Sequence, residues 1–183
     1  MFIDPFLPVQ TTRLTLRCVD VGDAAATSAL MTPEVSRWLA NWPLPFGIES
    51  ALARIETMRR CASDGDAIPL AMIETVSGTL VGWITLARDG TRRRRGSLGY
   101  WLGQEYHGRG YMKEAVPAAL QAGFALLDLD VIEAAAQLTN IGSFAIMRAC
   151  GMKPVTTAMA HAPARNREEL CCLYEIARMS STI

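Results

Sequence analysis

Two glycines flank one long cation in the run Gly108-Arg109-Gly110. The residues before them, 99–102, are aromatic and branched and predict a strand, whereas the apolar spacing of 112–127 predicts a helix. Glycine lets a ligand approach the backbone closely, and the first turn of a helix leaves amide N–H groups unpaired. Strand, glycine turn and helix start together predict a site for an anion such as a phosphate or pyrophosphate.

Two familiar phosphate-binding loops are excluded by the residues around this turn. The chain has no Gly-x-x-x-x-Gly-Lys-Ser/Thr run, and Lys113 stands where a dinucleotide-binding loop has its third glycine. A tight turn without a ligand is the alternative interpretation of a lone Gly-x-Gly, so the surrounding elements have to decide between the two.

Composition limits the classes of protein to which the chain can belong. Its 183 residues are 50% hydrophobic and 20% charged, which is typical of one soluble globular domain, and we expect a single domain over 1–183. The formal net charge is zero, so overall charge favours no stable binding to nucleic acid or membranes. Residues 1–10 lack the order of a signal peptide, and no apolar run reaches membrane-spanning length. We therefore expect a cytoplasmic protein.

The five cysteines have no metal-type spacing. Adjacent Cys171 and Cys172 fall in a predicted strand, where neighbouring side chains point to opposite faces. We therefore expect reduced thiols rather than disulfides, and no metal site.

Periodicity along the chain predicts the elements that position the glycine turn. Strict alternation predicts the strand 12–17, and apolar runs predict the strands 68–74 and 79–87. Amphipathic spacing predicts helices, and two prolines exclude regular structure from 41–47. The expected strands are 12–17, 68–74, 79–87, 97–102, 131–138, 152–158 and 169–178, and the expected helices are 20–31, 32–39, 49–62, 110–128 and 140–149.

The order of these elements predicts a mixed α+β fold. Antiparallel hairpins come first, and a parallel crossover through the helix 110–128 follows. The last two strands, 152–158 and 169–178, are expected to enclose a loop over 159–167.

With the elements in this order, the chain resembles the GNAT acyl-CoA N-acyltransferase superfamily. The resemblance is carried by Glu105-Tyr106-His107-Gly108-Arg109-Gly110-Tyr111, Asn140-Ile141-Gly142-Ser143 and Cys150-Gly151-Met152. The RimJ/RimL branch, the ribosomal-protein N-terminal acetyltransferases and their relatives, is similar at 12–17, Gly99-Tyr100-Trp101-Leu102 and Ile132-Glu133-Ala134. The similarity extends over 11–178, and several weak motifs in register are more specific than one loop.

The resemblance implies a mostly antiparallel mixed sheet flanked by helices, in which two parallel strands splay apart to hold acetyl-CoA. Pantetheine would pair with backbone near Trp101 and Leu102 and with the side chain of Asn140. Glu105 departs from the Gln or Arg that usually opens the loop, which matters little if backbone amides bind the pyrophosphate. Those amides would belong to His107, Gly108, Arg109, Gly110, Tyr111 and Met112.

The resemblance also implies direct attack of an amine on the thioester, with Ser143 contacting the cofactor and protonating the departing thiolate. Many relatives place a tyrosine four residues further on, where this chain has Met147. The alternative for Ser143 is an ordinary serine in the first turn of a helix. Glu133, in a strand of small apolar residues, is the candidate general base. Its alternative is a structural carboxylate paired to an arginine.

Three aromatic residues near the proline-rich segment 41–47 are candidates for the acceptor site. Trp38, Trp42 and Phe46 are expected to line it on the side opposite CoA, between that segment and the loop 159–167. Such aromatic clusters are as often simply core, which is the alternative. The arginines 92–95 are expected to form a solvated hairpin loop rather than to bind RNA or the adenosine phosphates.

The predicted function is transfer of an acetyl group from acetyl-CoA to a primary amine, foremost the N-terminal α-amine of a protein. The first alternative is acetylation of a small molecule such as an antibiotic, polyamine or amino acid, because acceptor specificity resides in variable loops. The second is a non-catalytic acyl-CoA-binding module, because the chain has no unambiguous base. The sequence is compatible with a monomer or a homodimer.

Overall fold

A computed structural model describes residues 7–179 of the protein. Part of the segment assessed for a signal peptide, 1–6, lies outside the described residues. The strands are β1 (Val9–Gln10), β2 (Leu14–Cys18), β3 (Ala67–Glu74), β4 (Leu80–Arg88), β5 (Arg95–Leu102), β6 (Val131–Gln137), β7 (Lys153–Ala162) and β8 (Arg167–Ala177). The α-helices are α1 (Ala24–Leu30), α2 (Pro33–Ser36), α3 (Ile48–Ser63), α4 (Tyr111–Leu126) and α5 (Ile141–Ala149).

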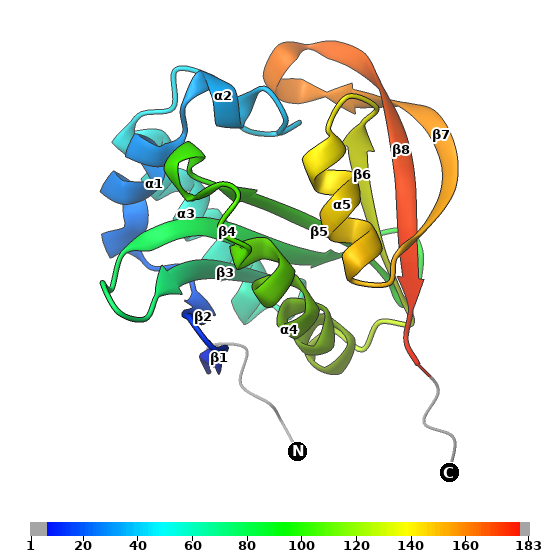
Figure 1. Ribbon diagram of the computed structural model, residues 1–183, viewed down its shortest axis with the longest axis horizontal. Helices are drawn as coiled ribbons and strands as arrows, with labels where there is room; N and C mark the ends of the chain where they lie inside the picture. Colours follow the sequence, from blue (N-terminus) through cyan, green and yellow to red (C-terminus); the bar gives the residue numbers. More distant parts are fainter. Residues whose placement is uncertain (1–6, 180–183) are drawn as a thin grey trace.

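The strands form one eight-stranded sheet in the order β1-β2-β3-β4-β5-β6-β8-β7 (Figure 1). All neighbours are antiparallel except β5 and β6, which are joined by the crossover through α4. The predicted α+β fold, a mostly antiparallel mixed sheet with one parallel strand pair, is confirmed.

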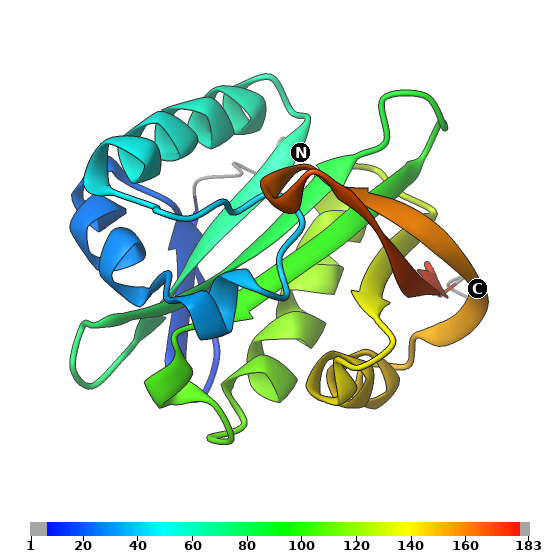
Figure 2. The ribbon, with the colours of Figure 1, turned by 90° about the horizontal axis from the view of Figure 1, so that it is seen from above.

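Helices cover both faces of the sheet (Figures 1 and 2). Each face has its own apolar core. Alternation along β5 divides its side chains between them. Leu98 and Leu102 join the core under α4 and α5, whereas Trp101 joins the core with α1 and α3. Among residues 7–179, no helix is long and apolar enough to cross a membrane.

The parallel strands β5 and β6 separate soon after they meet. Their ladder consists of Arg95–Ser97 against Val131–Glu133. Beyond it, β5 stays paired with β4 as far as Leu102, and β6 stays paired with β8 as far as Gln137. The expected splayed pair is therefore present, and we call the opening between 98–102 and 134–137 the gap.

The structure corrects the prediction near the end of the chain. The expected loop 159–167 is mostly strand, because the ladder continues from Met159↔Leu170 to Ala162↔Arg167 and leaves 163–166 as the turn. The side chains of β7 are exposed along nearly its whole length, so no apolar alternation marks its end. The short edge strand β1, Val9–Gln10, was also missed.

Candidate functional site

The glycine turn lies between β5 and α4, where the sequence placed it. Gly108 has φ 73° and Gly110, which precedes the first turn of α4, has φ 81°. Both angles lie in the left-handed region that glycine adopts without steric cost. Within the described chain, the amides of Gly108, Arg109 and Gly110 have no acceptor. They stand at the N-terminus of a 16-residue helix, so this loop can bind an anion.

His107 differs from the expectation for this loop. Its backbone N–H already donates to the Gln104 carbonyl at 3.2 Å, so that amide is not free for an anion. Its ring Nε2 lies 3.1 Å from the Leu102 carbonyl, which can only accept, so Nε2 carries the proton in this contact. The imidazole therefore connects the loop to the end of β5. The amides proposed to bind the anion are then those of residues 108–112.

Arg13, on the segment that leads into β2, holds the other side of the loop. Its Nη1 donates to the Arg109 carbonyl at 2.9 Å, and its Nε donates to Glu114 Oε2 at 2.8 Å. Burial would raise the pKa of Glu114, but the hydrogen bonds from Thr11 and Arg13 outweigh it and hold that pKa below its ordinary value. The Arg13–Glu114 pair spans 101 residues, so no local pattern in the sequence reveals it.

Asn140 and Ser143 lie at the start of α5, on the far side of the gap from β5. Asn140 Oδ1 accepts a hydrogen bond from the Ser143 amide at 3.1 Å and caps the helix. Its NH₂ group keeps two donors that can serve a ligand. Because Asn140 is the cap, the Ser143 hydroxyl is not needed for that role. It instead lies 2.8 Å from the hydroxyl of Tyr100 on β5, a contact that the sequence analysis missed.

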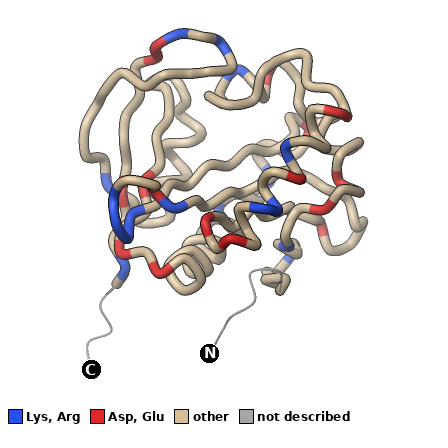
Figure 3. Tube along the Cα trace, turned by 180° about the vertical axis from the view of Figure 1, so that it is seen from behind, with Lys and Arg blue, Asp and Glu red and all other residues tan. Residues whose placement is uncertain are grey.

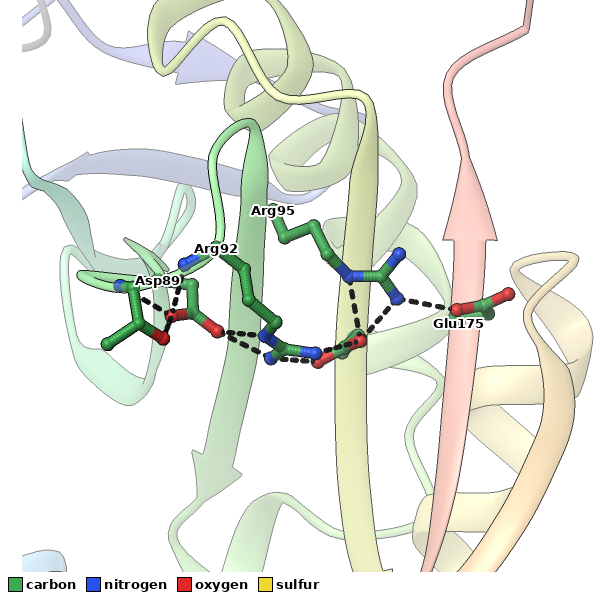
Figure 4. A network of polar contacts seen from close by, with 6 residues as sticks. Asp89, Arg92, Arg95 and Glu175 are labelled. Carbon is green, nitrogen blue, oxygen red and sulfur yellow. Dashed lines mark hydrogen bonds and ion pairs between the residues drawn. The ribbon is translucent and has the colours of Figure 1, made fainter.

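Glu133 lies in the β5–β6 ladder at the narrow end of the gap and is held by Arg92 and Arg95, whose side chains Figure 4 labels. Its two carboxylate oxygens accept from Arg92 Nη1 at 2.9 Å and Nη2 at 2.7 Å, and Arg95 Nε donates at 3.0 Å. Arg95 also reaches Glu175 on β8 at 2.7 Å. The Arg92 hydrogen bonds, with those of Arg95, hold the pKa of Glu133 below its ordinary value despite its burial. A carboxylate so held is a poor proton acceptor, and the structural alternative replaces the general-base hypothesis.

The expected hairpin loop connects β4 to β5, with Arg92 and Arg93 exposed, and the structure adds ion pairs to it. Arg92 pairs with Asp89 as well as Glu133, and Arg94 Nε lies 2.7 Å from Asp130 Oδ2. Seen from behind, the basic stretch of this hairpin lies beside acidic positions (Figure 3). Three of the four arginines are thus bonded within the protein, which also weakens the hypothesis that they bind RNA.

The aromatic residues near the proline-rich segment are mostly core. Trp42 is 9% exposed and Phe46 is 7% exposed. The Trp42 ring centroid lies 5.0 Å from that of Phe46 and 5.3 Å from those of Trp83 and Trp101. Trp42 and Phe46 therefore fit the alternative interpretation and offer little surface to an acceptor. Trp38 is half-buried, with the Arg37 guanidinium 4.6 Å from its ring centroid.

Two segments join above the end of β6, and we call them the arch: residues 36–40 and the turn 163–165. The Ala164 amide donates to the Ala40 carbonyl at 2.8 Å, and Arg165 Nη1 donates to the Ser36 carbonyl at 3.1 Å. Gln137 of β6 donates to the Arg37 carbonyl at 3.0 Å. Figure 1 shows α2 beside the tip of the β7–β8 hairpin. Loops far apart in the sequence thus meet near the expected acceptor side.

Comparison with known proteins agrees with this arrangement. A family model described as acetyltransferase (GNAT) domain matches residues 13–153. An uncharacterised N-acetyltransferase, p20 of Bacillus licheniformis, is 27% identical over 138 residues, which cover 75% of this chain and 77% of that protein.

Two solved structures show the same fold. Mycobacterium smegmatis RimJ in complex with CoA-disulfide has a TM-score of 0.81 at 21% identity, covering 97% of this chain and 88% of that chain. The ribosomal-protein-S5-alanine acetyltransferase from Vibrio fischeri has a TM-score of 0.79 at 18% identity, covering 97% and 100%.

The splayed strands, the glycine loop at a helix start and the family match together define an acetyltransferase. The protein belongs to the GNAT acetyltransferase family, whose members use acetyl-CoA.

Proposed function

We propose that the protein transfers the acetyl group of acetyl-CoA to a primary amine, foremost the N-terminal α-amine of a protein. The observation that carries the proposal is the free amide row at Gly108, Arg109 and Gly110, which opens α4 beside the gap. Pyrophosphate binds these amides, and Tyr111 and Met112 continue the row into the helix. Pantetheine extends along β5 beside Trp101 and Leu102, where the NH₂ group of Asn140 can reach it from α5.

The acceptor class is supported by the two structural neighbours. One is the RimJ of Mycobacterium smegmatis, and the other is a ribosomal-protein-S5-alanine acetyltransferase. Their structural similarity at low sequence identity supports the fold alone. A protein N-terminus is therefore the first acceptor to test. A small-molecule amine remains the competing acceptor.

The chemistry needs a neutral amine, a polarised thioester and a proton for the departing sulfur. The amine nitrogen forms a bond to the acetyl carbon, and the C–S bond then breaks to leave a thiolate. Ser143 is our candidate to protonate that thiolate, because its hydroxyl faces β5 across the gap. Glu133 is engaged by Arg92 and Arg95, so in this proposal the amine proton leaves through water, and water returns a proton to Ser143 Oγ.

A screen of acceptors tests the proposal directly. Purified protein is mixed with acetyl-CoA and either peptides that differ in their first residue or a library of polyamines, aminoglycosides and amino acids. Release of free CoA thiol and acetylation of the α-amine are then measured. Acetylation of peptides supports the proposal, whereas turnover with small amines alone favours the competing acceptor. Binding of acetyl-CoA without turnover would identify a non-catalytic binding module.

Substitution of Ser143 tests the proton donor. We expect Ser143→Ala to lower kcat by about 10- to 100-fold, because one transition-state hydrogen bond is lost. The dissociation constant of acetyl-CoA should stay within about twofold, since the loop amides are untouched. Calorimetric titration and steady-state thiol release measure the two quantities. Full activity of the variant would remove Ser143 from the mechanism.

A further inference from the structure

Tyr100 connects the two sides of the gap through its hydroxyl. That oxygen lies 2.8 Å from Ser143 Oγ and 3.2 Å from the Ser143 carbonyl oxygen. Its ring comes from β5 and packs, half-buried, against the core under α4 and α5. The contact joins β5 to α5, the helix that follows β6, beyond the point at which the β5–β6 ladder ends. The Tyr100 hydroxyl therefore contacts the hydroxyl that, in the proposed function, gives its proton to the departing thiolate.

Two arrangements of protons fit these distances. A phenol has one proton and a carbonyl can only accept, so Tyr100 donates either to the Ser143 carbonyl or to Ser143 Oγ. When it donates to the carbonyl, the serine proton is used up in a bond to the phenol oxygen. When it donates to Oγ, the serine proton is released toward the gap, and accepting one hydrogen bond strengthens the donation of another.

We propose that Tyr100 is a positioning residue, which donates to Ser143 Oγ and so directs the Ser143 proton at the departing sulfur. The inference rests on the proposed role of Ser143. Burial raises the pKa of Tyr100 to about 12, and the bond with Ser143 offsets part of that rise. Tyr100 thus stays protonated at neutral pH and remains a donor throughout the cycle.

A bond that merely ties α5 to the sheet is the competing explanation, and Tyr174 offers a matched control. The Tyr174 hydroxyl, on β8, accepts from Arg148 Nε of α5 at 3.1 Å, and its ring stacks on Phe144 at 5.6 Å between centroids. Tyr174→Phe therefore removes a second hydroxyl that ties α5 to the sheet without touching Ser143.

The test combines Tyr100→Phe, Ser143→Ala and the double variant, assayed with acetyl-CoA and an Ala-initiated peptide or the best amine of the screen. We expect Tyr100→Phe to lower kcat about tenfold, which corresponds to about 1.4 kcal/mol, with KM and acetyl-CoA affinity nearly unchanged. In the Ser143→Ala background the same change should have no further effect on kcat. Tyr174→Phe should lower Tm as much as Tyr100→Phe while keeping wild-type kcat.

Outcomes of three kinds would overturn the inference. If Tyr100→Phe keeps wild-type kcat while Ser143→Ala is impaired, Ser143 is still the proton donor but Tyr100 does not position it. A loss that is equally large in both backgrounds, or is shared by Tyr174→Phe, assigns Tyr100 a structural role. Wild-type kcat in Ser143→Ala, or absence of turnover with any acceptor, refutes the proposed mechanism itself and the inference with it.

Discussion

Replacing Gly110 by valine is expected to abolish acetyl-CoA binding, raising the dissociation constant by roughly 100-fold or more, about 2.8 kcal/mol. Gly110 has φ 81°, a conformation that a β-branched residue adopts only with strain. A Cβ there would also stand 3.5 Å from Arg13 Nη2, within the contacts that fasten the loop. Relaxation of the strain would change the backbone conformation that leaves the amides of 108–110 free, and the anion site would be lost.

Isothermal titration with CoA measures the effect, and Gly65→Val is the matched control. Gly65 has φ 78° and open space around the Cβ position, but it lies in the turn between α3 and β3. Its substitution should destabilise the fold by a similar amount and leave CoA affinity unchanged. A folded Gly110→Val protein that binds CoA like the wild type would refute the anion loop.

Replacing Trp42 by alanine is expected to destabilise the fold by about 3–5 kcal/mol, the usual cost of removing a buried large aromatic side chain. Trp42 contacts three aromatic rings in the core beneath α1 and α3. The Arg54 guanidinium also lies 4.4 Å from its ring centroid, a stacking contact that the substitution would remove.

Urea unfolding followed by circular dichroism measures this loss. Trp38→Ala is the control, because that ring is half-buried and should cost markedly less. A Trp42→Ala protein of wild-type stability, with a raised KM for the acceptor alone, would reverse our reassignment. It would restore Trp42 to the wall of the acceptor site.

Much of the fold could be predicted because the hydrophobic periodicity agrees with the positions of turn residues and helix-boundary residues over most of the chain. The β3–β4 hairpin has long apolar runs around a polar turn, and α4 has a glycine entry and sixteen residues of helical spacing. The β7–β8 hairpin could not be delimited in this way. It stands at the sheet edge, where exposed side chains such as Val155 and Met159 carry no alternating pattern.

The parts of the site that are formed by backbone could be predicted from the sequence. Contacts between side chains that are far apart in the sequence could not. Gly108 and Gly110 are visible because only glycine suits their turn. Glu133 was visible as an acid among apolar residues, but its partners Arg92 and Arg95 lie about forty positions away. The Tyr100–Ser143 contact likewise joins residues 43 positions apart, and nothing local marks it.

The gap between β5 and β6 has a consequence for how the molecule holds together. Within residues 7–179, the only strand pairing between the first five strands and the last three is the short ladder of Arg95–Ser97 with Val131–Glu133. Past that ladder, the facing edges of 98–102 and 134–137 present backbone groups without a strand between them. The pantetheine arm of acetyl-CoA contains amide groups, and if bound there it would pair with these edges as an added strand does. The bound co-substrate would then connect the two parts of the sheet. Each turnover would break this connection when CoA leaves and form it again when acetyl-CoA binds.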